Sequence, residues 1–444
     1  MQKLNFITLK SVDTEYSADS VEWCPHPHFQ SYLACGTNHI WLVRLLLEAA
    51  AMLLSFSWHN NVKDVVVDGG SGGGGVGVVV DAVVVAAVTV VLAVVVVVRV
   101  ALATVDAATL PATLLTARTS DSVVVDNNRS VVGVNVANDC FGRIYLYRFC
   151  STTKQLQEIY PMETAAILGM KWLHTQSEDN PLLAAVNSFG QVELYEMKDD
   201  ILRMISNLEL NPIYDDILAL SLDWRRLGCS TSQQFQILIS DSKGGLNLID
   251  YKPELGLKKF YTFSAHGFEA WTCAFYKWDI NRIYSGGDDI LLQAYDLRSS
   301  SRIFTNKSHN AGVTSLLSHS MREHLLLTGS YDEHLRIFDT RSMKAPLEQL
   351  NLGGGIWRLK ADPFQGDRIL ADCMYHNFSI VQLSNEELIV PTIVGEYFAH
   401  KGICYGAYWC RNIKCNENQD FYVATWSFYD HKLNVAHVKD AQLF

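Results

Sequence analysis

Short runs of apolar residues, separated by clusters of Gly, Asp and Ser, recur through the second half of the chain. The clearest runs are residues 283–285, 291–295, 325–328 and 335–338. Short runs that are apolar throughout, or that alternate apolar with polar positions, are typical of β-strands when turn residues bound them. The clusters at 286–289 and 329–332 have the composition of tight turns. The pattern therefore predicts an all-β protein built from short strands joined by hairpins.

The same landmarks return at a fixed interval, which indicates an internal repeat. In each copy a His is followed 23 residues later by an Asp, and an aromatic–Asp pair ends seven residues after that Asp. The two copies are His266, Asp289 and Tyr295-Asp296, and His309, Asp332 and Phe338-Asp339. The displacement of 43 residues falls within the period of about 40–45 that is typical of four-stranded propeller blades. The landmarks resemble those of the WD-repeat family.

Weaker copies of the repeat account for most of the remaining chain. Two strand–turn–strand patterns each follow an apolar run that ends in Trp. The patterns cover 183–195 and 237–248, the apolar runs cover 167–172 and 218–224, and two further blades cover 353–383 and 399–438. We expect the alternating stretch 4–9 to form the outer strand that closes the last blade. Together these segments predict an all-β, seven-bladed WD-repeat β-propeller.

A stretch of unusual composition interrupts blade one. The blade opens with strands at 20–24 and 32–37, but its next strand is predicted only at 142–147. Almost every residue from 64 to 107 is Val, Ala, Gly or Asp, and all codons for these four residues begin with G. Such a bias is typical of a translated nucleotide repeat, and it predicts a segment that is unstructured or an artefact of the gene model.

A membrane span is the alternative interpretation of this stretch. Residues 82–98 give 17 uncharged positions, which is the lower limit for crossing a bilayer. A membrane helix would split one blade, so we favour the first interpretation. The predicted domains are a propeller made of 1–40 and 141–444 and a low-complexity insertion at 41–140.

Charge and composition narrow the classes of function. The net charge of −11 is unsuitable for a nucleic-acid surface. The first 20 residues lack the apolar core of a secretory signal, and the ten cysteines contain no CxxC pair. These features indicate reduced thiols in a cytoplasmic protein. We expect a monomer without membrane association.

No GxSxG, P-loop or HExxH motif reveals an activity, so residues that depart from the repeat carry more information. Five positions beyond the repeated His lie Trp271, Thr314 and Tyr405, and Trp357 has the equivalent position in blade six. Three aromatic rings at one mouth of the propeller would form a box for a quaternary ammonium group. The alternative is that these rings simply pack the inner strands.

Charged and titratable residues are predicted near the same mouth. Glu269 and Asp288 would add negative charge beside the box, and Arg358 would bind a carboxylate or an oxyanion. The candidates for proton transfer are His266, His334 and His376. The alternative for the histidines is structural: His266 would brace its blade through hydrogen bonds, and the other two would be ordinary turn residues.

Several strings are more specific than the repeat itself. They are 12–25, 33–37, Phe268–Trp271, Tyr284–Asp289, Gly329–His334, Gly354–Arg358 and Ser427–His431. Together they resemble the eukaryotic WD-repeat diphthine methyl ester esterases of diphthamide biosynthesis. The resemblance covers 10–37 and 141–438, which is all of the chain except the insertion and the ends.

The resemblance implies a carboxylic methyl ester hydrolase. Members of this family remove a methyl ester from over-methylated diphthine, a modified histidine of translation elongation factor 2, and need no metal or organic cofactor. Glu269, His266 or His334 would then act as base, and Arg358 or backbone amides would stabilise the oxyanion. Substrate binding would involve Trp271, Asp288, Trp357, Tyr405 and His376. The alternative is a non-enzymatic WD-repeat scaffold for protein assembly or trafficking.

Overall fold

The structure is a computed structural model that describes most of the chain outside the low-complexity insertion. It describes residues 3–38, 141–173, 180–211, 217–228, 233–385, 388–411 and 421–440. The insertion predicted at 41–140 lies outside the described residues. Within the described ranges every regular element is a strand, and no helix there is long and apolar enough to cross a bilayer.

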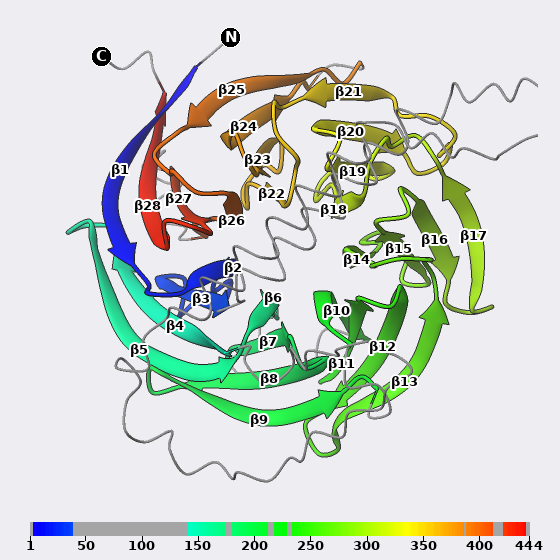
Figure 1. Cartoon of the computed structure of the whole chain (residues 1–444), viewed down its shortest axis with the longest axis horizontal. Coiled ribbons are helices and arrows are strands. Elements are labelled where there is room, and N and C mark those ends of the chain that lie inside the picture. Colours follow the sequence, from blue (N-terminus) through cyan, green and yellow to red (C-terminus); the bar gives the residue numbers. More distant parts are fainter. Residues whose placement is uncertain are drawn as a thin grey trace, which may run out of the picture. The chain divides into compact units, whose positions relative to one another are not determined.

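Seven four-stranded antiparallel sheets surround one axis, and each has its first strand nearest the axis (Figure 1). Blades 1 and 2 contain β2 (Ser17–Trp23), β3 (Tyr32–Asn38), β4 (Phe141–Cys150) and β5 (Gln155–Ala165), then β6 (Ile167–Trp172), β7 (Leu182–Asn187), β8 (Gln191–Lys198) and β9 (Ile201–Glu209). Blades 3 and 4 contain β10 (Ala219–Leu227), β11 (Gln234–Asp241), β12 (Gly245–Lys252) and β13 (Gly256–Ser264), then β14 (Thr272–Phe275), β15 (Arg282–Gly286), β16 (Leu292–Asp296) and β17 (Ser301–Asn306).

The remaining three blades complete the ring. Blades 5 and 6 contain β18 (Val313–Ser318), β19 (Leu325–Ser330), β20 (His334–Asp339) and β21 (Glu348–Asn351), then β22 (Leu359–Ala361), β23 (Arg368–Cys373), β24 (Asn377–Leu383) and β25 (Pro391–Tyr397). Blade 7 contains β26 (Cys404–Trp409), β27 (Phe421–Ser427), β28 (Lys432–Asp440) and β1 (Leu4–Asp13). The predicted seven-bladed propeller is confirmed.

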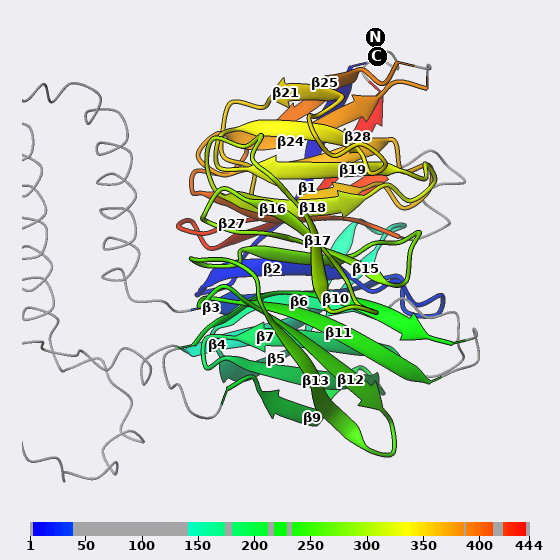
Figure 2. The same ribbon diagram turned by 90° about the vertical axis from the view of Figure 1, so that its right-hand side faces the viewer.

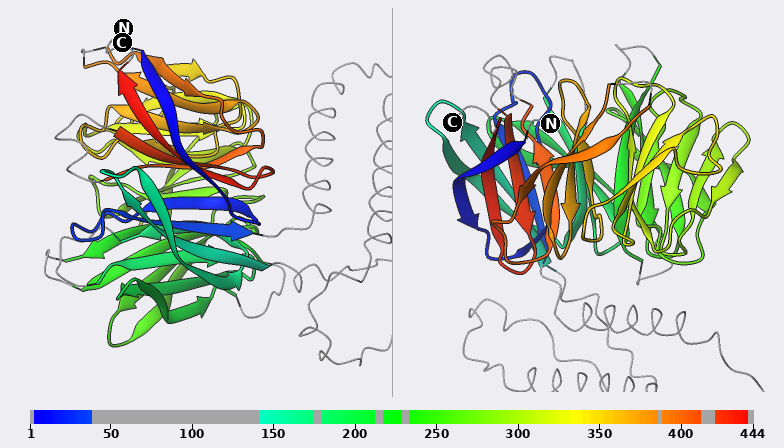
Figure 3. Two further views of the ribbon diagram at one scale, coloured as in Figure 1. Left: turned by 90° about the vertical axis from the view of Figure 1, so that its left-hand side faces the viewer. Right: turned by 90° about the horizontal axis from the view of Figure 1, so that it is seen from above.

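The N-terminal strand closes the ring. Strand β1 pairs antiparallel with β28, from Leu4 opposite Asp440 to Asp13 opposite Lys432, so the two described ends of the chain lie side by side (Figure 3). This pairing covers the edge that β28 would otherwise expose. It confirms the closing role that the alternating pattern at 4–9 predicts.

The core lies between neighbouring blades rather than in one central cluster. Strand β3 is buried along its whole length, whereas the outer strand β13 is largely exposed. Tryptophans of the inner strands tie one blade to the previous one. Trp172 Nε1 donates to the Glu22 carbonyl at 3.1 Å, and Trp224 Nε1 donates to the Lys171 carbonyl at 3.0 Å. The Trp that ends each predicted apolar run is therefore an inter-blade tie.

All inner strands run in one direction, which defines two ends of the propeller. The upper rim is the end at which the inner strands begin, and it carries the turns between second and third strands. The lower rim is the end at which the inner strands finish. In the side view the inner strands β2, β6 and β10 run next to one another (Figure 2).

The sequence located many inner and middle strands, but apart from β1 it located no outer strand. Strand β6 has the predicted bounds, and β3 pairs directly with β4 although more than a hundred residues separate them in the chain. Blade 6 was expected to end at 383, but it continues to β25. This strand begins with Pro391, a residue that lacks the backbone donor, and a proline is tolerated there because β25 is an outer strand.

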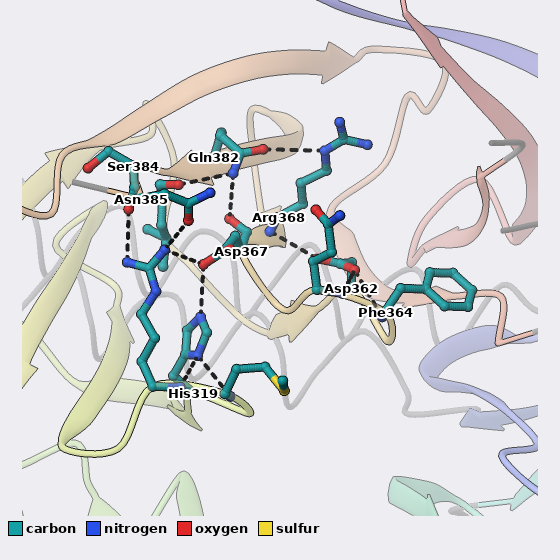
Figure 4. A network of polar contacts seen from close by, with 12 residues as sticks. His319, Asp362, Phe364, Asp367, Arg368, Gln382, Ser384 and Asn385 are labelled. Atoms are coloured by element: carbon teal, nitrogen blue, oxygen red, sulfur yellow. Dashed lines mark hydrogen bonds and ion pairs between the residues drawn. The ribbon is translucent and has the colours of Figure 1, made fainter.

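A polar network fixes the lower rim between blades 5 and 6 (Figure 4). Arg322 donates to Asp367 Oδ1 at 2.5 Å, to Asn385 Oδ1 at 2.6 Å and to the Ser384 carbonyl at 2.8 Å. His319 Nε2 lies 3.4 Å from Asp367 Oδ1, and burial lowers the pKa of His319. The network joins two blades and lies at the end opposite the predicted site.

Candidate active site at the upper rim

One residue of each blade lines the mouth of the upper rim, at the start of the inner strand. In five blades the strand register shifts by one residue at this point, and such bulges re-aim a side chain. The residues at this position in blades 1 to 7 are Asp19, Leu168, Leu220, Trp271, Thr314, Trp357 and Tyr405. We call these seven residues the mouth ring.

The three aromatic members of the mouth ring lie together. The Trp357 ring stacks on Tyr405 with centroids 4.6 Å apart, and it meets Trp271 at 5.6 Å. Two turn residues extend the group. Tyr331 packs against Trp271 and Trp357 at 6.1 and 5.9 Å, and Phe428 packs against Tyr405 at 5.6 Å. These five residues, from blades 4 to 7, form what we call the aromatic cluster.

A carboxylate is bonded to this aromatic cluster. The indole N–H of Trp271 donates to Asp288 Oδ1 at 3.0 Å, and the backbone N–H of Asp288 donates to the Glu269 carbonyl at 2.9 Å. Gly312 makes the approach possible, because a Cβ there would lie 2.8 Å from Asp288 Oδ1 and 3.1 Å from the Tyr331 ring. Aromatic faces next to a carboxylate suit a cation.

The Arg358 side chain joins the aromatic cluster to the other side of the channel. Its guanidinium carbon lies 5.3 Å from the centroid of the Trp357 ring. Arg358 Nη2 donates to the Leu168 carbonyl in blade 2 at 3.3 Å and lies 3.8 Å from Asp19 Oδ1 in blade 1. One guanidinium therefore contacts three blades, with donors to spare for an anionic group.

Asp19 is buried but incompletely paired. Asn38 Nδ2 donates to its Oδ2 over a long 3.4 Å, whereas Asp19 Oδ1 has no hydrogen-bond partner. Two neighbouring atoms, Trp357 Nε1 and Asn38 Oδ1, also lack partners. Burial raises the pKa of Asp19 to about 7, although Arg358, Trp357 and Asn38 act in the opposite direction. The upper rim therefore holds a carboxyl that can gain or lose a proton near neutral pH.

The predicted histidine His266 belongs to a closed network inside blade 4. Its Nδ1 lies 2.8 Å from Asp289 Oδ1 and its Nε2 lies 2.8 Å from Ser285 Oγ. The connectivity is that of a Ser–His–Asp triad, but Ser285 is fully buried in β15, and its hydroxyl is engaged with His266 inside the blade. Both ring nitrogens of His266 are thus engaged within the blade.

Below Arg358 the channel contains a cavity of about 1040 Å³ that reaches the lower rim. Two of its lysines are paired with carboxylates at short distances. Lys171 Nζ lies 2.7 Å from Asp223 Oδ1, and Lys360 Nζ lies 2.6 Å from Glu22 Oε1. Arg358 therefore lies between two environments: ion pairs at hydrogen-bond distance below it, and the less closely paired Asp19 carboxyl beside it.

Comparison with known proteins identifies relatives that cover most of this propeller. The chain is 32% identical over 415 residues to human "Diphthine methyltransferase", covering 90% of this chain and 74% of the human protein. The chain belongs to the diphthine methyltransferase family. The Dictyostelium discoideum "Diphthine methyltransferase homolog" is 34% identical over 61% of this chain and 76% of its own length, and the Schizosaccharomyces pombe "Diphthine methyltransferase" is 30% identical over 66% and 84%.

The other comparisons concern the fold of this diphthine methyltransferase family member. No family model matches the chain. A chain of the "Crystal Structure of Mitotic Checkpoint Complex" aligns with 68% of this chain and 84% of its own length, with a TM-score of 0.52 and 17% identity. At this identity the likeness shows the fold alone, and it agrees with a propeller.

Two predicted histidines of this family member make their contacts away from the aromatic cluster. His334 begins β20, the third strand of blade 5, and its Nδ1 lies 2.6 Å from the Asp332 carbonyl. His376 is exposed, packs against Phe398 at 5.5 Å, and has its Nε2 3.7 Å from Glu396 of the outer strand β25. The contacts of His334 and His376 are thus farther out in their blades than those of Trp357.

Four residues of the site were missed by sequence reasoning: Asp19, Asn38, Tyr331 and Phe428. A signal for Tyr331 exists, because it directly precedes the turn Asp of blade 5, as Asp288 does in blade 4. Asp19 has a weaker signal. Blade 1 lacks the repeated His, so its mouth-ring position cannot be counted from that landmark.

Proposed function

We propose that this protein hydrolyses the carboxyl methyl ester of methylated diphthine on translation elongation factor 2, as a step of diphthamide biosynthesis. The observation that carries the proposal is the aromatic cluster with Asp288 on one side and Arg358 on the other, in a family named for diphthine. The relatives' names describe methyl transfer. Hydrolysis also removes a methyl group from methylated diphthine, with water as the second reactant.

The aromatic cluster supports the binding half of this proposal. Diphthine carries a trimethylammonium group, which cannot form N–H hydrogen bonds and is bound best by aromatic faces. Trp271, Trp357 and Tyr405 supply those faces, and Asp288 supplies negative charge beside them. Glu269, whose backbone carbonyl accepts from the Asp288 N–H, is a second acidic residue next to this group. Each favourable cation–ring contact contributes about 0.5–2 kcal/mol.

Arg358 supports the chemical half. Ester hydrolysis develops negative charge on the carbonyl oxygen, and the guanidinium of Arg358 is a strong donor to such an oxyanion. Among the bases predicted from the sequence, His266 has both ring nitrogens engaged and His334 lies in the third strand of blade 5. Glu269, two residues before Trp271, is the member of that set closest in the chain to the aromatic cluster.

Exposed aromatic residues surround the mouth and suit a protein substrate. They are Phe268, Tyr375, Phe398 and Tyr429, each at least half exposed and each in a loop or turn of the upper rim. Apolar side chains that gather on one face are typical of an interaction surface. A modified histidine presented by elongation factor 2 could then reach the aromatic cluster while its own protein docks on this rim.

Methanol release from methylated elongation factor 2 tests the proposal. We expect release by the wild type, and reduced release by Trp271→Ala and by Glu269→Gln. The matched control is Trp278→Ala, which changes a tryptophan at the lower rim whose indole donates to the His319 carbonyl. Full activity in both upper-rim variants would contradict the assignment of the site.

A non-enzymatic scaffold is the second candidate, and the exposed aromatic rim favours it. A scaffold would bind a partner on the same face without changing it chemically. Mass spectrometry of elongation factor 2 from cells that lack this protein separates the two candidates. Accumulated methyl ester supports the hydrolase, whereas normal diphthamide supports the scaffold.

A further inference from the structure

Asp19 occupies the position of blade 1 that tryptophan or tyrosine occupies in blades 4, 6 and 7. It is the one carboxyl residue of the mouth ring, and the register shift of β2 between Ala18 and Ser20 makes it the bulged residue. Thr314, the other polar member, is satisfied because its hydroxyl donates to the Gly329 and Ile356 carbonyls. Asp19 has no comparable set of partners.

Buried polar atoms without partners occur in several blades, and two of them belong to the neighbouring side chains of Asp19 and Trp357 beside Arg358. Asp19 Oδ1 and Trp357 Nε1 are both buried and unpartnered, and Arg358 Nη2 lies 3.8 Å from that oxygen. A distance of this length is too great for a direct hydrogen bond, so the guanidinium faces this carboxylate oxygen without closing on it. Buried groups that lack partners weaken a fold, so they require an explanation such as catalysis or a bound water.

We propose that Asp19 is the general base of the ester hydrolysis, acting beside Arg358 as the oxyanion donor. This inference rests on the proposed function and names the residue that moves the proton. Glu269 is then assigned to binding the cation together with Asp288. The two carboxyl groups would have different roles because their surroundings differ. Glu269 belongs with the aromatic faces, and Asp19 with the guanidinium of Arg358.

The reaction balances with these groups alone. Asp19 Oδ1 takes a proton from water while the water oxygen forms a bond to the ester carbonyl carbon. The carbonyl oxygen becomes an oxyanion, which Arg358 stabilises. Collapse of this intermediate breaks the bond to the methoxy oxygen, and methoxide takes the proton from Asp19. The products are methanol and a carboxylic acid that loses its proton to solvent.

The surroundings of Asp19 suit this task. Arg358 of blade 6 is the charged group that faces it, Asn38 and Trp357 are its polar neighbours, and Asp372 acts on the same Arg358 from β23. Burial raises the pKa of Asp19 to about 7, against the charge of Arg358. A general base works best when its pKa is near the working pH.

Steady-state methanol release by the full-length protein tests the assignment. We expect Asp19→Asn to lower kcat about a hundredfold or more with little change in KM, because positioned acid–base groups contribute about 100- to 10,000-fold. Glu269→Gln should instead raise KM. The matched control is Glu193→Gln, which alters another buried carboxyl, bonded to Tyr195 and Asn187 in blade 2, and should leave both constants unchanged.

The pH profile separates catalysis from a structural role. Wild-type kcat should rise with pH through about 7, and Asp19→Asn should lose this rise. Asn38→Ala removes a hydrogen bond that lowers the Asp19 pKa, so it should move the rise to higher pH even if Asp19→Asn folds poorly. An active wild type with a fully active Asp19→Asn, or with an unmoved profile in Asn38→Ala, overturns this inference alone. A wild type that releases no methanol overturns the proposed function.

Discussion

Two charge pairs connect the same two stretches of chain, and they differ in the distance between the cation and the carboxylate. Lys360 Nζ lies 2.6 Å from Glu22 Oε1 in the channel. Two residues earlier, Arg358 Nη2 lies 3.8 Å from Asp19 Oδ1. Each carboxylate has one oxygen without a hydrogen-bond partner, Asp19 Oδ1 and Glu22 Oε2. Both carboxyl groups belong to β2, and both cations lie at or next to β22.

The difference separates a structural pair from a pair available for chemistry. A buried ion pair that closes at hydrogen-bond distance compensates part of the cost of removing its charges from water. A pair at a longer distance compensates less of this desolvation cost, and its charged groups remain able to bind another molecule. The lower pair therefore has the geometry expected of a structural contact, and the upper pair that of a functional site.

The largest effect is expected when the carboxyl group of each pair is neutralised in turn and the rates of methanol release are compared. We expect Asp19→Asn to reduce methanol release about a hundredfold or more, whereas Glu22→Gln leaves the rate unchanged. Both substitutions neutralise a buried carboxyl of β2, so they are matched in chemistry. Equal losses in the two variants would show that the comparison has no functional meaning.

The next effect is on the pH dependence of stability. The folded pKa of Asp19 is raised from 3.8 to about 7, so its contribution to stability is full below about pH 4 and is lost as pH rises through about 7. The free energy of unfolding of the wild type, relative to Asp19→Asn, should fall by up to about 4 kcal/mol over that window. Urea titrations at several pH values measure it, and a difference that does not change with pH would contradict the burial argument.

Breaking the lower pair should cost stability without affecting catalysis. Glu22→Gln leaves the Lys360 ammonium in the channel without its counter-charge, and losing one partner of a buried pair typically costs about 3 kcal/mol. Thermal unfolding of the variant beside the wild type checks this effect. An unchanged melting temperature would mean that water already compensates Lys360.

The smallest effect is expected at the aromatic cluster. Trp271→Ala should raise KM for the trimethylammonium substrate about tenfold, because losing one cation–ring contact costs about 1–2 kcal/mol. An analogue that has a neutral isosteric group in place of the ammonium should lose this dependence on Trp271. The same rise in KM with the neutral analogue would point to general packing instead of cation recognition.

The sequence predicted most of the fold because the repeat is local. The 43-residue displacement between His266 and His309 and the alternating stretch 4–9 were enough to locate blades 4, 5 and 7. The outer strands other than β1 escaped because their patterns are weaker: β13 is largely exposed, and β25 begins with Pro391. Residues 41–140 lie outside the described residues, so their interpretation stays a prediction.

The sequence alone revealed only part of the site, because the site forms when distant blades meet as the ring closes. Trp271, Trp357 and Tyr405 stood out, since they occupy equivalent positions in the clearer blades. Asp19 did not stand out, because its meeting with Arg358 joins residues that are more than three hundred positions apart. Such contacts follow from the number of blades and the bulge register, and no local pattern reveals them.

The most direct test of the central claim is mass spectrometry of methylated elongation factor 2 incubated with the purified protein in water labelled with heavy oxygen. The account predicts that the modified histidine loses the mass of one methylene group, gains one heavy oxygen in its carboxylate, and that methanol appears without any methyl donor. A substrate that is unchanged, or that gains a methyl group only when a donor is added, would contradict it.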